Sequence, residues 1–279
     1  MIVDGHCHLW RIARGDYDWL KPNLGALYRD FEPADLVPLL AGAGLAGAVV
    51  VQAAPTAAET RFLLDLAART PALLGVVGWT DLTNSDAPAT IAELAKAPLL
   101  KGIRPMLQDL PNDDFILQPA AAPGLQALVD HELRFDALVR PRHLPVLCRL
   151  RERYPTLPIV VDHLAKPGIA ADEWEPWASA LRDLASDGLT VCKLSGMVTE
   201  AGPGWTVSQL ARYADLVFDI FGPDRVMWGS DWPVVLLASD YDGWLETTTT
   251  LLAGLSANER AAVMGGTAQR FYGLSGEAC

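Results

Sequence analysis

Eight short apolar runs, rich in β-branched residues, recur along the chain, and each is followed by a longer segment with apolar residues at helical spacing. The runs cover residues 2–8, 47–52, 73–79, 100–104, 135–139, 159–163, 190–195 and 225–231. Strands that alternate with helices predict parallel βα units, because parallel neighbours need a crossover connection. Eight units in 279 residues fit one closed (β/α)8 barrel of the TIM type better than two open sheets. No linker divides the chain, so we expect a single domain over residues 1–279.

The charge balance limits the class of partner. The formal net charge is −12, whereas nucleic acids and anionic membranes favour a basic surface, so we expect a small-molecule substrate instead. No apolar run reaches the ~18–20 residues that a membrane span needs. The sequence is compatible with a homo-oligomer. The cysteines Cys7, Cys148, Cys192 and Cys279 show no CxxC spacing, which predicts reduced thiols. Together with the absence of a basic leader, this predicts a cytoplasmic location.

Two histidines alternate at the end of the first run, which reads Asp4-Gly5-His6-Cys7-His8. Strand side chains alternate between faces, so Asp4, His6 and His8 face one way and Cys7 faces the other. At the carboxyl end of a barrel strand the two imidazoles would point into the mouth, where they can bind a metal or stabilise an oxyanion. Asp4, one step deeper, could orient one of them. A hydrogen-bonded histidine pair without a function would give the same pattern.

Titratable residues also end the sixth and eighth runs. Asp162 and His163 end the sixth, and residues 229–233 (Gly-Ser-Asp-Trp-Pro) end the eighth. Each pattern alone could be a helix cap, since Asp and Ser favour helix N-termini. Capping does not explain why three separate strands bring histidines and an aspartate to one rim. We therefore predict a catalytic site made of His6, His8, His163 and Asp231.

Four residues are predicted to contact the substrate. Arg104 ends the fourth run, and its guanidinium suits a carboxylate or carbonyl oxygen, with a salt bridge at the rim as the alternative. Trp19 lies in the connection 9–32, which is long and has to lie on the catalytic face; its aromatic residues either line the pocket or pack on the rim. Lys193 in the seventh run either pairs with Asp4 or meets the substrate, and His143 follows the fifth run on the catalytic face.

The sequence resembles the amidohydrolase superfamily along essentially the whole chain, in the branch that contains 2-pyrone-4,6-dicarboxylate lactonase and the fucono- and rhamnono-lactonases. The motifs that carry the resemblance are DGHCHLW at 4–10, VVGW at 76–79, KGIR at 101–104, VDHLAKP at 161–167, CKLSG at 192–196, GPDR at 222–225, GSDWP at 229–233 and RFYGL at 270–274.

The resemblance implies a (β/α)8 barrel with Asp231 as the general base. In lactone opening, Asp231 would take a proton from water during attack on the carbonyl and return it to the leaving alkoxide. The three histidines, helped by a cation for which Arg104 is preferred, would stabilise the developing oxyanion.

The need for a metal stays open at this level. Many members of the superfamily have a histidine on strand five, but residues 135–139 read Phe-Asp-Ala-Leu-Val, and Lys101 is not clearly at the end of its strand, so a two-metal centre is not expected. His6, His8 and Asp231 would suffice for one divalent ion, zinc or manganese. The branch also implies enzymes that work without metal, and the sequence leaves both readings standing.

We expect a hydrolase that acts on a carboxylic ester bond, a lactonase for an aldonolactone such as a fucono-, rhamnono- or galactono-lactone in carbohydrate catabolism. A pocket with Trp and Arg at its rim suits a polyhydroxy ring. The alternative is a metal-dependent decarboxylase of the same superfamily, against which the missing strand-five histidine counts. A non-catalytic binding protein is a third reading, disfavoured by the presence of Asp231.

Overall fold

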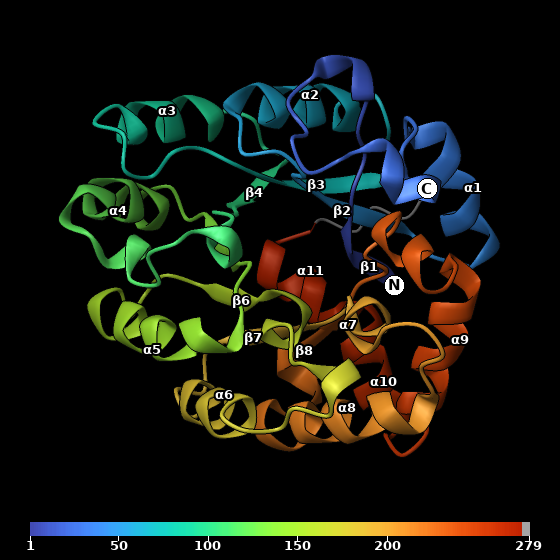
Figure 1. The fold of residues 1–279 in the computed structure, drawn as a ribbon. Helices are drawn as coiled ribbons and strands as arrows, with labels where there is room; N and C mark the ends of the chain where they lie inside the picture. Colours follow the sequence, from blue (N-terminus) through green and yellow to red (C-terminus); the bar gives the residue numbers. More distant parts are fainter. Residues whose placement is uncertain (275–279) are drawn as a thin grey trace.

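The computed structural model describes residues 1–274, so Cys279 lies outside the described residues. All eight predicted strands are present and parallel, and they pair in chain order. Figure 1 shows them at the centre of the molecule with the helices around them. The strands are β1 (Val3–Cys7), β2 (Gly47–Val51), β3 (Leu73–Gly78), β4 (Leu100–Ile103), β5 (Arg134–Ala137), β6 (Ile159–Val161), β7 (Val191–Leu194) and β8 (Val226–Trp228). The predicted (β/α)8 barrel is confirmed.

Every strand ends one to three residues earlier than the sequence predicts, and in β6 and β8 this leaves a site residue beyond the strand. The sixth was expected to reach His163 and the eighth to reach Asp231, but β6 ends at Val161 and β8 at Trp228. The reason is the backbone, because His163 and Asp231 both have left-handed conformations, with φ of 53° and 54°. A left-handed residue cannot continue a strand and is costly for residues other than glycine.

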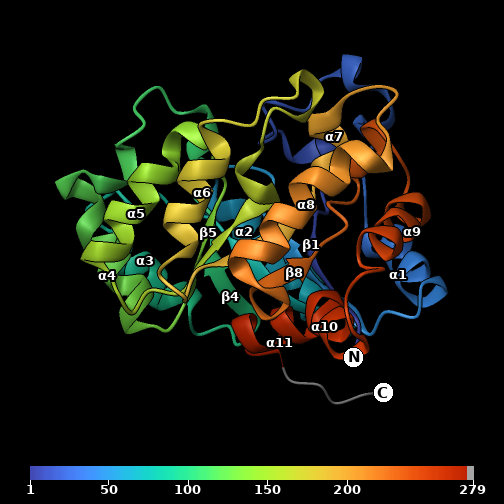
Figure 2. The ribbon, with the colours of Figure 1, turned by 90° about the horizontal axis from the view of Figure 1, so that it is seen from below.

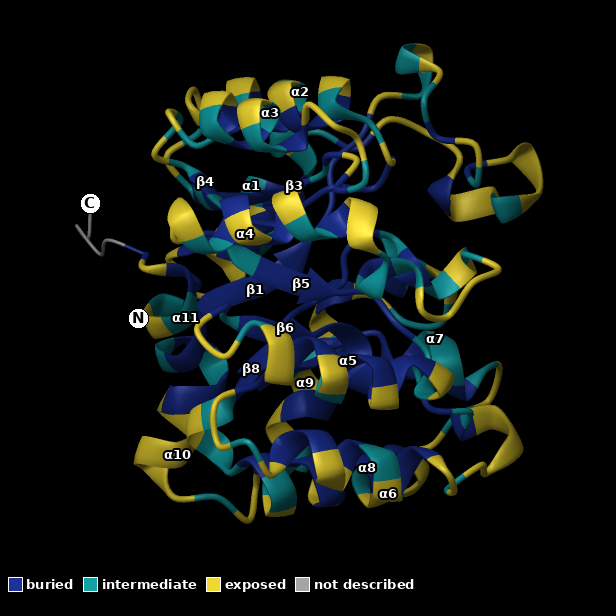
Figure 3. Cartoon of the chain, turned by 90° about the vertical axis from the view of Figure 1, so that its left-hand side faces the viewer, coloured by how far each residue is buried: buried dark blue, intermediate teal, exposed yellow. Residues whose placement is uncertain are grey.

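Helices cover the outer surface of the barrel, and their inward faces are buried while their outward faces are exposed (Figure 3). The longest, α8, starts with a capping box between Thr206 and Gln209 and buries Leu210, Tyr213 and Val217 on one face. No helix within residues 1–274 is long and apolar enough to cross a membrane. The helices are α1 (Pro33–Gly42), α2 (Ala57–Ala67), α3 (Ala87–Leu94), α4 (Ala122–Asp130), α5 (Leu144–Arg153), α6 (Trp177–Ala185), α7 (Met197–Ala201), α8 (Val207–Phe221), α9 (Tyr241–Leu251), α10 (Ala257–Ala261) and α11 (Thr267–Tyr272).

The barrel closes where the segment after β8 meets β1. The backbone N–H of Asp231 donates to the carbonyl of His6 at 2.8 Å, and that of His8 donates to the carbonyl of Trp232 at 2.7 Å. Buried Asp4 supports this seam, since one of its carboxylate oxygens accepts from the backbone of His6 at 3.1 Å and of Ser230 at 2.9 Å. Asp4 therefore holds the strands together rather than orienting a histidine ring.

The two ends of the barrel differ in what covers them. Figure 2 shows α10 and α11 at the same end as the N-terminus, with α7 at the opposite end. At the N-terminal end the side chain of Tyr272, from α11, is fully buried. At the other end the connection 9–32 packs through Trp10, which is buried, makes edge contacts with Trp19 and Phe31, and donates to the carbonyl of Arg29.

We predict that Asp4→Ala weakens the fold. The second carboxylate oxygen of Asp4 accepts from the Tyr241 hydroxyl at 3.1 Å, so the substitution leaves three buried donors without an acceptor, each at a cost of ~1–3 kcal/mol. The free energy of unfolding in urea should fall by roughly 3 kcal/mol or more. The control Tyr241→Phe removes one hydrogen bond and should cost about 1 kcal/mol. Equal losses for the two variants would contradict the role of Asp4 at the seam.

Candidate active site

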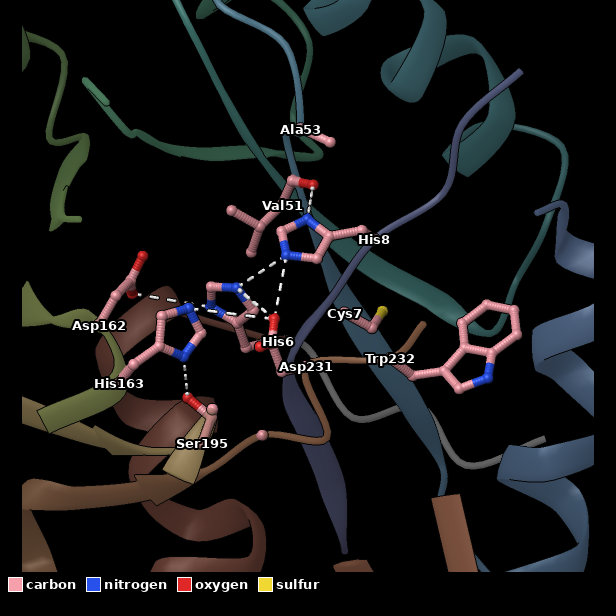
Figure 4. A network of polar contacts seen from close by, with 12 residues as sticks. His6, Cys7, His8, Val51, Ala53, Asp162, His163, Ser195, Asp231 and Trp232 are labelled. Carbon is pink, nitrogen blue, oxygen red and sulfur yellow. Dashed lines mark hydrogen bonds and ion pairs between the residues drawn. The ribbon is translucent and has the colours of Figure 1, made fainter. Parts of the chain in front are cut away.

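Three imidazoles and one carboxylate converge at the carboxyl end of the barrel (Figure 4). Nε2 of His6 lies 3.1 Å from Nε2 of His8, which lies 3.2 Å from Oδ1 of Asp231. The same oxygen lies 3.6 Å from Nε2 of His6 and 3.9 Å from Nε2 of His163. All four side chains are at most 6% exposed. The structure thus brings together the four residues that the sequence predicts to be catalytic, from the ends of β1, β6 and β8.

Each imidazole is oriented through its other ring nitrogen. Nδ1 of His8 lies 2.8 Å from the carbonyl oxygen of Val51, which can only accept, so Nδ1 carries the proton and Nε2 presents a lone pair to the cluster. Nδ1 of His163 lies 2.8 Å from Oγ of Ser195. Cys7 points away from the cluster, as strand alternation predicts (Figure 4), and its sulfur lies 3.5 Å from the carbonyl of Val49.

His6 is held from beneath by a buried ammonium group. Nζ of Lys193 lies 3.0 Å from Nδ1 of His6, 2.6 Å from Oδ2 of Asp136 and 2.9 Å from Oδ1 of Asp162. An ammonium has three protons and no lone pair, so these three acceptors match it one to one. With Nδ1 accepting, neutral His6 carries its proton on Nε2 and donates into the cluster.

Electrostatics keep Asp231 ionised and the imidazoles of His6 and His163 neutral. Burial alone would raise the pKa of Asp231, but His163, His8 and His6 outweigh it and hold the pKa well below its ordinary value. Burial lowers the pKa of His163 to about 4, against the opposing effect of Asp231, and lowers the pKa of His6 well below its usual range, helped by the charge of Lys193. At neutral pH the site therefore combines the carboxylate of Asp231 with the neutral imidazoles of His6 and His163.

The charge of Arg104 lies beside the same cluster. Its Nη1 lies 3.4 Å from Nε2 of His6 and donates to Asp162 at 3.2 Å. Its Nη2 donates to the backbone carbonyl of Gln52 and to the side-chain oxygen of that residue. The side chain is only 3% exposed, so the guanidinium is fixed in place before any ligand arrives.

A cavity of about 200 Å³, the catalytic cavity, opens onto the cluster. Of the four residues predicted to contact substrate, Arg104 and Trp19 line it, and Trp19 is fixed by donating to the carbonyl of Ala53 at 2.7 Å. The cavity is lined by His8, Trp19, Ala53, Arg104, Met106, Gln108, Asp109, Leu138, His163, Lys166, Asp231 and Val234.

Lys193 and His143 are not among those lining residues. Lys193 is fully buried below the cluster and pairs with Asp136 and Asp162, not with Asp4 as the sequence suggested. His143 turns back onto its own loop, where its Nδ1 accepts from the backbone N–H of Arg140 at 3.1 Å. A loop position on the catalytic face does not by itself turn a side chain towards the cavity.

Sequence reasoning missed residues of two kinds. Asp136 and Asp162 are the counter-charges of Lys193. The sequence did contain a signal for this pairing, because a charged residue in or next to a buried apolar strand needs a partner of opposite charge. Gln108 and Lys166 line the catalytic cavity from irregular segments. No periodic signal marks Gln108 or Lys166, and the turn that carries Lys166 is left-handed from His163 onwards.

Two glycines let backbone approach the imidazoles closely. A Cβ on Gly196 would lie 2.7 Å from Nδ1 of His163, and a Cβ on Gly229 would lie 2.6 Å from Cβ of His6. Gly196 also has a positive φ of 66°, which favours glycine. The motifs at 192–196 and 229–233 thus contain glycines that the positions of the histidines require.

The donor atoms fit one divalent cation. Two zinc bonds of about 2.1 Å at a tetrahedral angle place ligand atoms about 3.4 Å apart, and the His6, His8 and Asp231 atoms lie 3.1, 3.2 and 3.6 Å from one another. His6, His163 and Asp231 form a second suitable set, with ligand atoms within 4.8 Å of one another. The ordered partners of His8 and His163 at Nδ1 are of the kind that support metal-binding histidines.

The chain belongs to the amidohydrolase family, whose sequence profile matches residues 3–274. It is 49% identical over 274 residues to an L-fucono-1,5-lactonase of Burkholderia ambifaria, a match that covers 97% of this chain and 94% of the relative. It is 38% identical to an L-fucono-1,5-lactonase of Burkholderia multivorans, with 98% and 96% covered. A crystal structure of an amidohydrolase from Burkholderia multivorans with bound zinc superimposes with a TM-score of 0.94 at 37% identity, covering 99% of this chain and all of that one.

We predict that Gly196→Ala impairs catalysis by displacing His163. The matched control is Gly188→Ala, because Gly188 has a similar φ of 71° but nothing within 4 Å of an added Cβ. Both variants should lose about 1–2 kcal/mol of unfolding free energy from backbone strain, and only Gly196→Ala should lose kcat/KM, by tenfold or more. Steady-state kinetics and urea unfolding measure the two effects. Unchanged kinetics in Gly196→Ala would show that the position of His163 does not matter.

Proposed function

We propose that this protein is a hydrolase that opens the ring of a sugar-acid lactone, an aldonolactone such as L-fucono-1,5-lactone. The observation that carries the proposal is the ionised, buried Asp231 beside the imidazoles of His8 and His163 and the fixed guanidinium of Arg104, which all line one small cavity. The two L-fucono-1,5-lactonases, which match over almost the whole chain, support the choice of a lactone over other esters. The cavity of about 200 Å³ suits a single sugar ring, and Trp19 offers that ring an aromatic surface.

The reaction adds water across the ring ester. Asp231 accepts a proton from water as the water oxygen attacks the lactone carbonyl. Without a metal, the developing oxyanion receives hydrogen bonds from Nε2 of His6 and from the Arg104 guanidinium, which are both buried and held by other residues. The carbonyl carbon then loses its bond to the ring oxygen, the Asp231 carboxyl returns the proton to that oxygen, and an open-chain aldonic acid leaves.

A divalent cation, zinc or manganese, would be held by His6, His8 and Asp231, with His163 next to them. It would take the place of the Nε2 proton of His6 and would polarise the lactone carbonyl as a Lewis acid. The decarboxylase alternative shares the fold, but residues 134–139, which include strand β5, contain no histidine.

Two further properties belong to the proposal. We propose that residues 1–279 form a single domain, which the family match over 3–274 supports. We also propose a cytoplasmic location, supported by the free thiols of Cys7, Cys148 and Cys192.

The substrate class is tested by acid release from a panel of aldonolactones in weakly buffered solution with a pH indicator. We expect turnover of L-fuconolactone, with slower turnover of L-rhamnono- and D-galactono-lactone. An aromatic or muconic carboxylic acid, assayed for carbon dioxide, serves as the comparison for the decarboxylase reading. Release of carbon dioxide without turnover of any lactone would overturn the proposed function.

We predict that Asp231→Asn lowers kcat by ~10²–10⁴, the usual contribution of a positioned general base. Asn keeps the size of the side chain and tolerates the left-handed backbone at this position. KM should change far less, because the carboxylate acts mainly in the transition state. Metal content measured on the same preparations separates two roles, since a variant that loses bound metal together with activity has lost a ligand. A kcat near the wild-type value would exclude both roles.

A further inference from the structure

A second and larger cavity, here called the side chamber, adjoins the catalytic cavity. Its volume is about 470 Å³, and it shares Trp19, Met106 and Asp109 with the catalytic cavity. The side chamber lies between the connection 9–32 and the segments that follow β3 and β4. The lining consists of Asp18, Trp19, Pro55, Trp79, Thr80, Asp81, Leu82, Thr83, Pro105, Met106, Asp109, Leu110 and Phe115.

The walls of the side chamber are mostly apolar. Two indole rings, from Trp19 and Trp79, and the side chains of Leu110 and Phe115 are only partly buried there, so they keep apolar surface in contact with water. Concave apolar surface of this kind is typical of a ligand site, because filling it removes that surface from water. A polyhydroxy ring, which fits the catalytic cavity, would leave the side chamber unfilled.

Charge further restricts what can enter. Three carboxylates that line the side chamber, Asp18, Asp81 and Asp109, are all exposed. Among the described residues that line it there is no lysine, arginine or histidine. A carboxylate, phosphate or sulfonate substituent would be repelled there. Because the three carboxylates are exposed and screened by water, the apolar walls favour a neutral, apolar group over a cation.

We propose that the side chamber binds a neutral alkyl substituent on the lactone ring, so that the enzyme also hydrolyses alkyl-substituted δ-lactones. This inference rests on the proposed function, since the reacting ester occupies the catalytic cavity in both cases. The step is the same: water adds to the carbonyl carbon, the bond from that carbon to the ring oxygen breaks, and the proton from water ends on that oxygen. The product is a hydroxy acid whose alkyl chain lies against Trp19 and Met106, at the junction of the two cavities.

The test is a homologous series of δ-lactones with straight alkyl chains on the carbon that bears the ring oxygen, from δ-hexanolactone to δ-dodecanolactone. Burial of a methylene gives ~0.8 kcal/mol, which corresponds to about fourfold in kcat/KM for each added carbon. We expect kcat/KM to rise by about that factor along the series until the side chamber is full. A flat or falling series would overturn the inference.

Matched variants test whether the alkyl chain binds in the side chamber. Leu110 lines it but does not line the catalytic cavity, and it is only partly buried. Leu110→Trp should fill the space and abolish the dependence on chain length, while Leu110→Ala should keep it. Both should hydrolyse L-fuconolactone like the wild type. Leu237→Trp, at an exposed position outside both cavities, controls for the added indole.

The outcomes separate this inference from the proposed function. Turnover of L-fuconolactone without any gain from longer chains leaves the function standing and rejects the side chamber as an alkyl site. A gain from longer chains that persists in Leu110→Trp also rejects it, because the chain then lies elsewhere. Turnover of alkyl lactones alone would instead reject the sugar-acid substrate and keep the site.

Discussion

A buried cation inside the barrel is the interaction on which the site depends. Lys193 on β7 has no exposed surface, and an ammonium in such a place is tolerated only when it is fully paired. Its partners come from other strands: Asp136 from β5, Asp162 from the end of β6, and His6 from β1. Removing any one of them would leave an unpaired charge or donor, which costs several kcal/mol. One ammonium therefore fixes the relative positions of four strands at the base of the site.

The same cation connects the two ends of the barrel. Burial raises the pKa of Asp136, against the opposing charge of Lys193, and the Tyr272 hydroxyl of α11 donates to this carboxyl at 2.6 Å. For Asp162, burial is outweighed by Lys193, His6 and Arg104, which hold its pKa well below the ordinary value. The ionised form is thus favoured more strongly for Asp162, the carboxyl next to the catalytic cluster. A hydrogen-bonded path runs from the C-terminal helix through Asp136 and Lys193 to His6.

The strands and the cluster of His6, His8, His163 and Asp231 could be predicted from the sequence, because both follow from local patterns. Strand period places His6 and His8 on one face, and a parallel barrel gathers its strand ends at one rim. Pairing across the barrel is different, because the partners of Lys193 depend on the stagger between strands, which no local pattern encodes. Loop conformation is equally hard to predict, and it decides which side chains reach the cavity. Lys166 lines the catalytic cavity although the sequence did not single it out, whereas His143, which was predicted to contact substrate, does not. The side chamber is built wholly from such segments.

The hydrogen bonds that close the barrel also position the catalytic residues. The backbone N–H of Asp231 donates to the carbonyl of His6, so the hydrogen bond that joins the ends of the sheet also joins the proposed base to its neighbouring imidazole. β8 ends at Trp228, three residues before Asp231. The chain leaves the strand, turns left-handed at Asp231 and thereby aims the carboxylate inward rather than along the sheet. The left-handed conformation costs about 1–3 kcal/mol, and the hydrogen bonds between β1 and the segment after β8 offset this cost. The carboxylate of Asp231 is therefore held in place before substrate binds, at the expense of some folding stability.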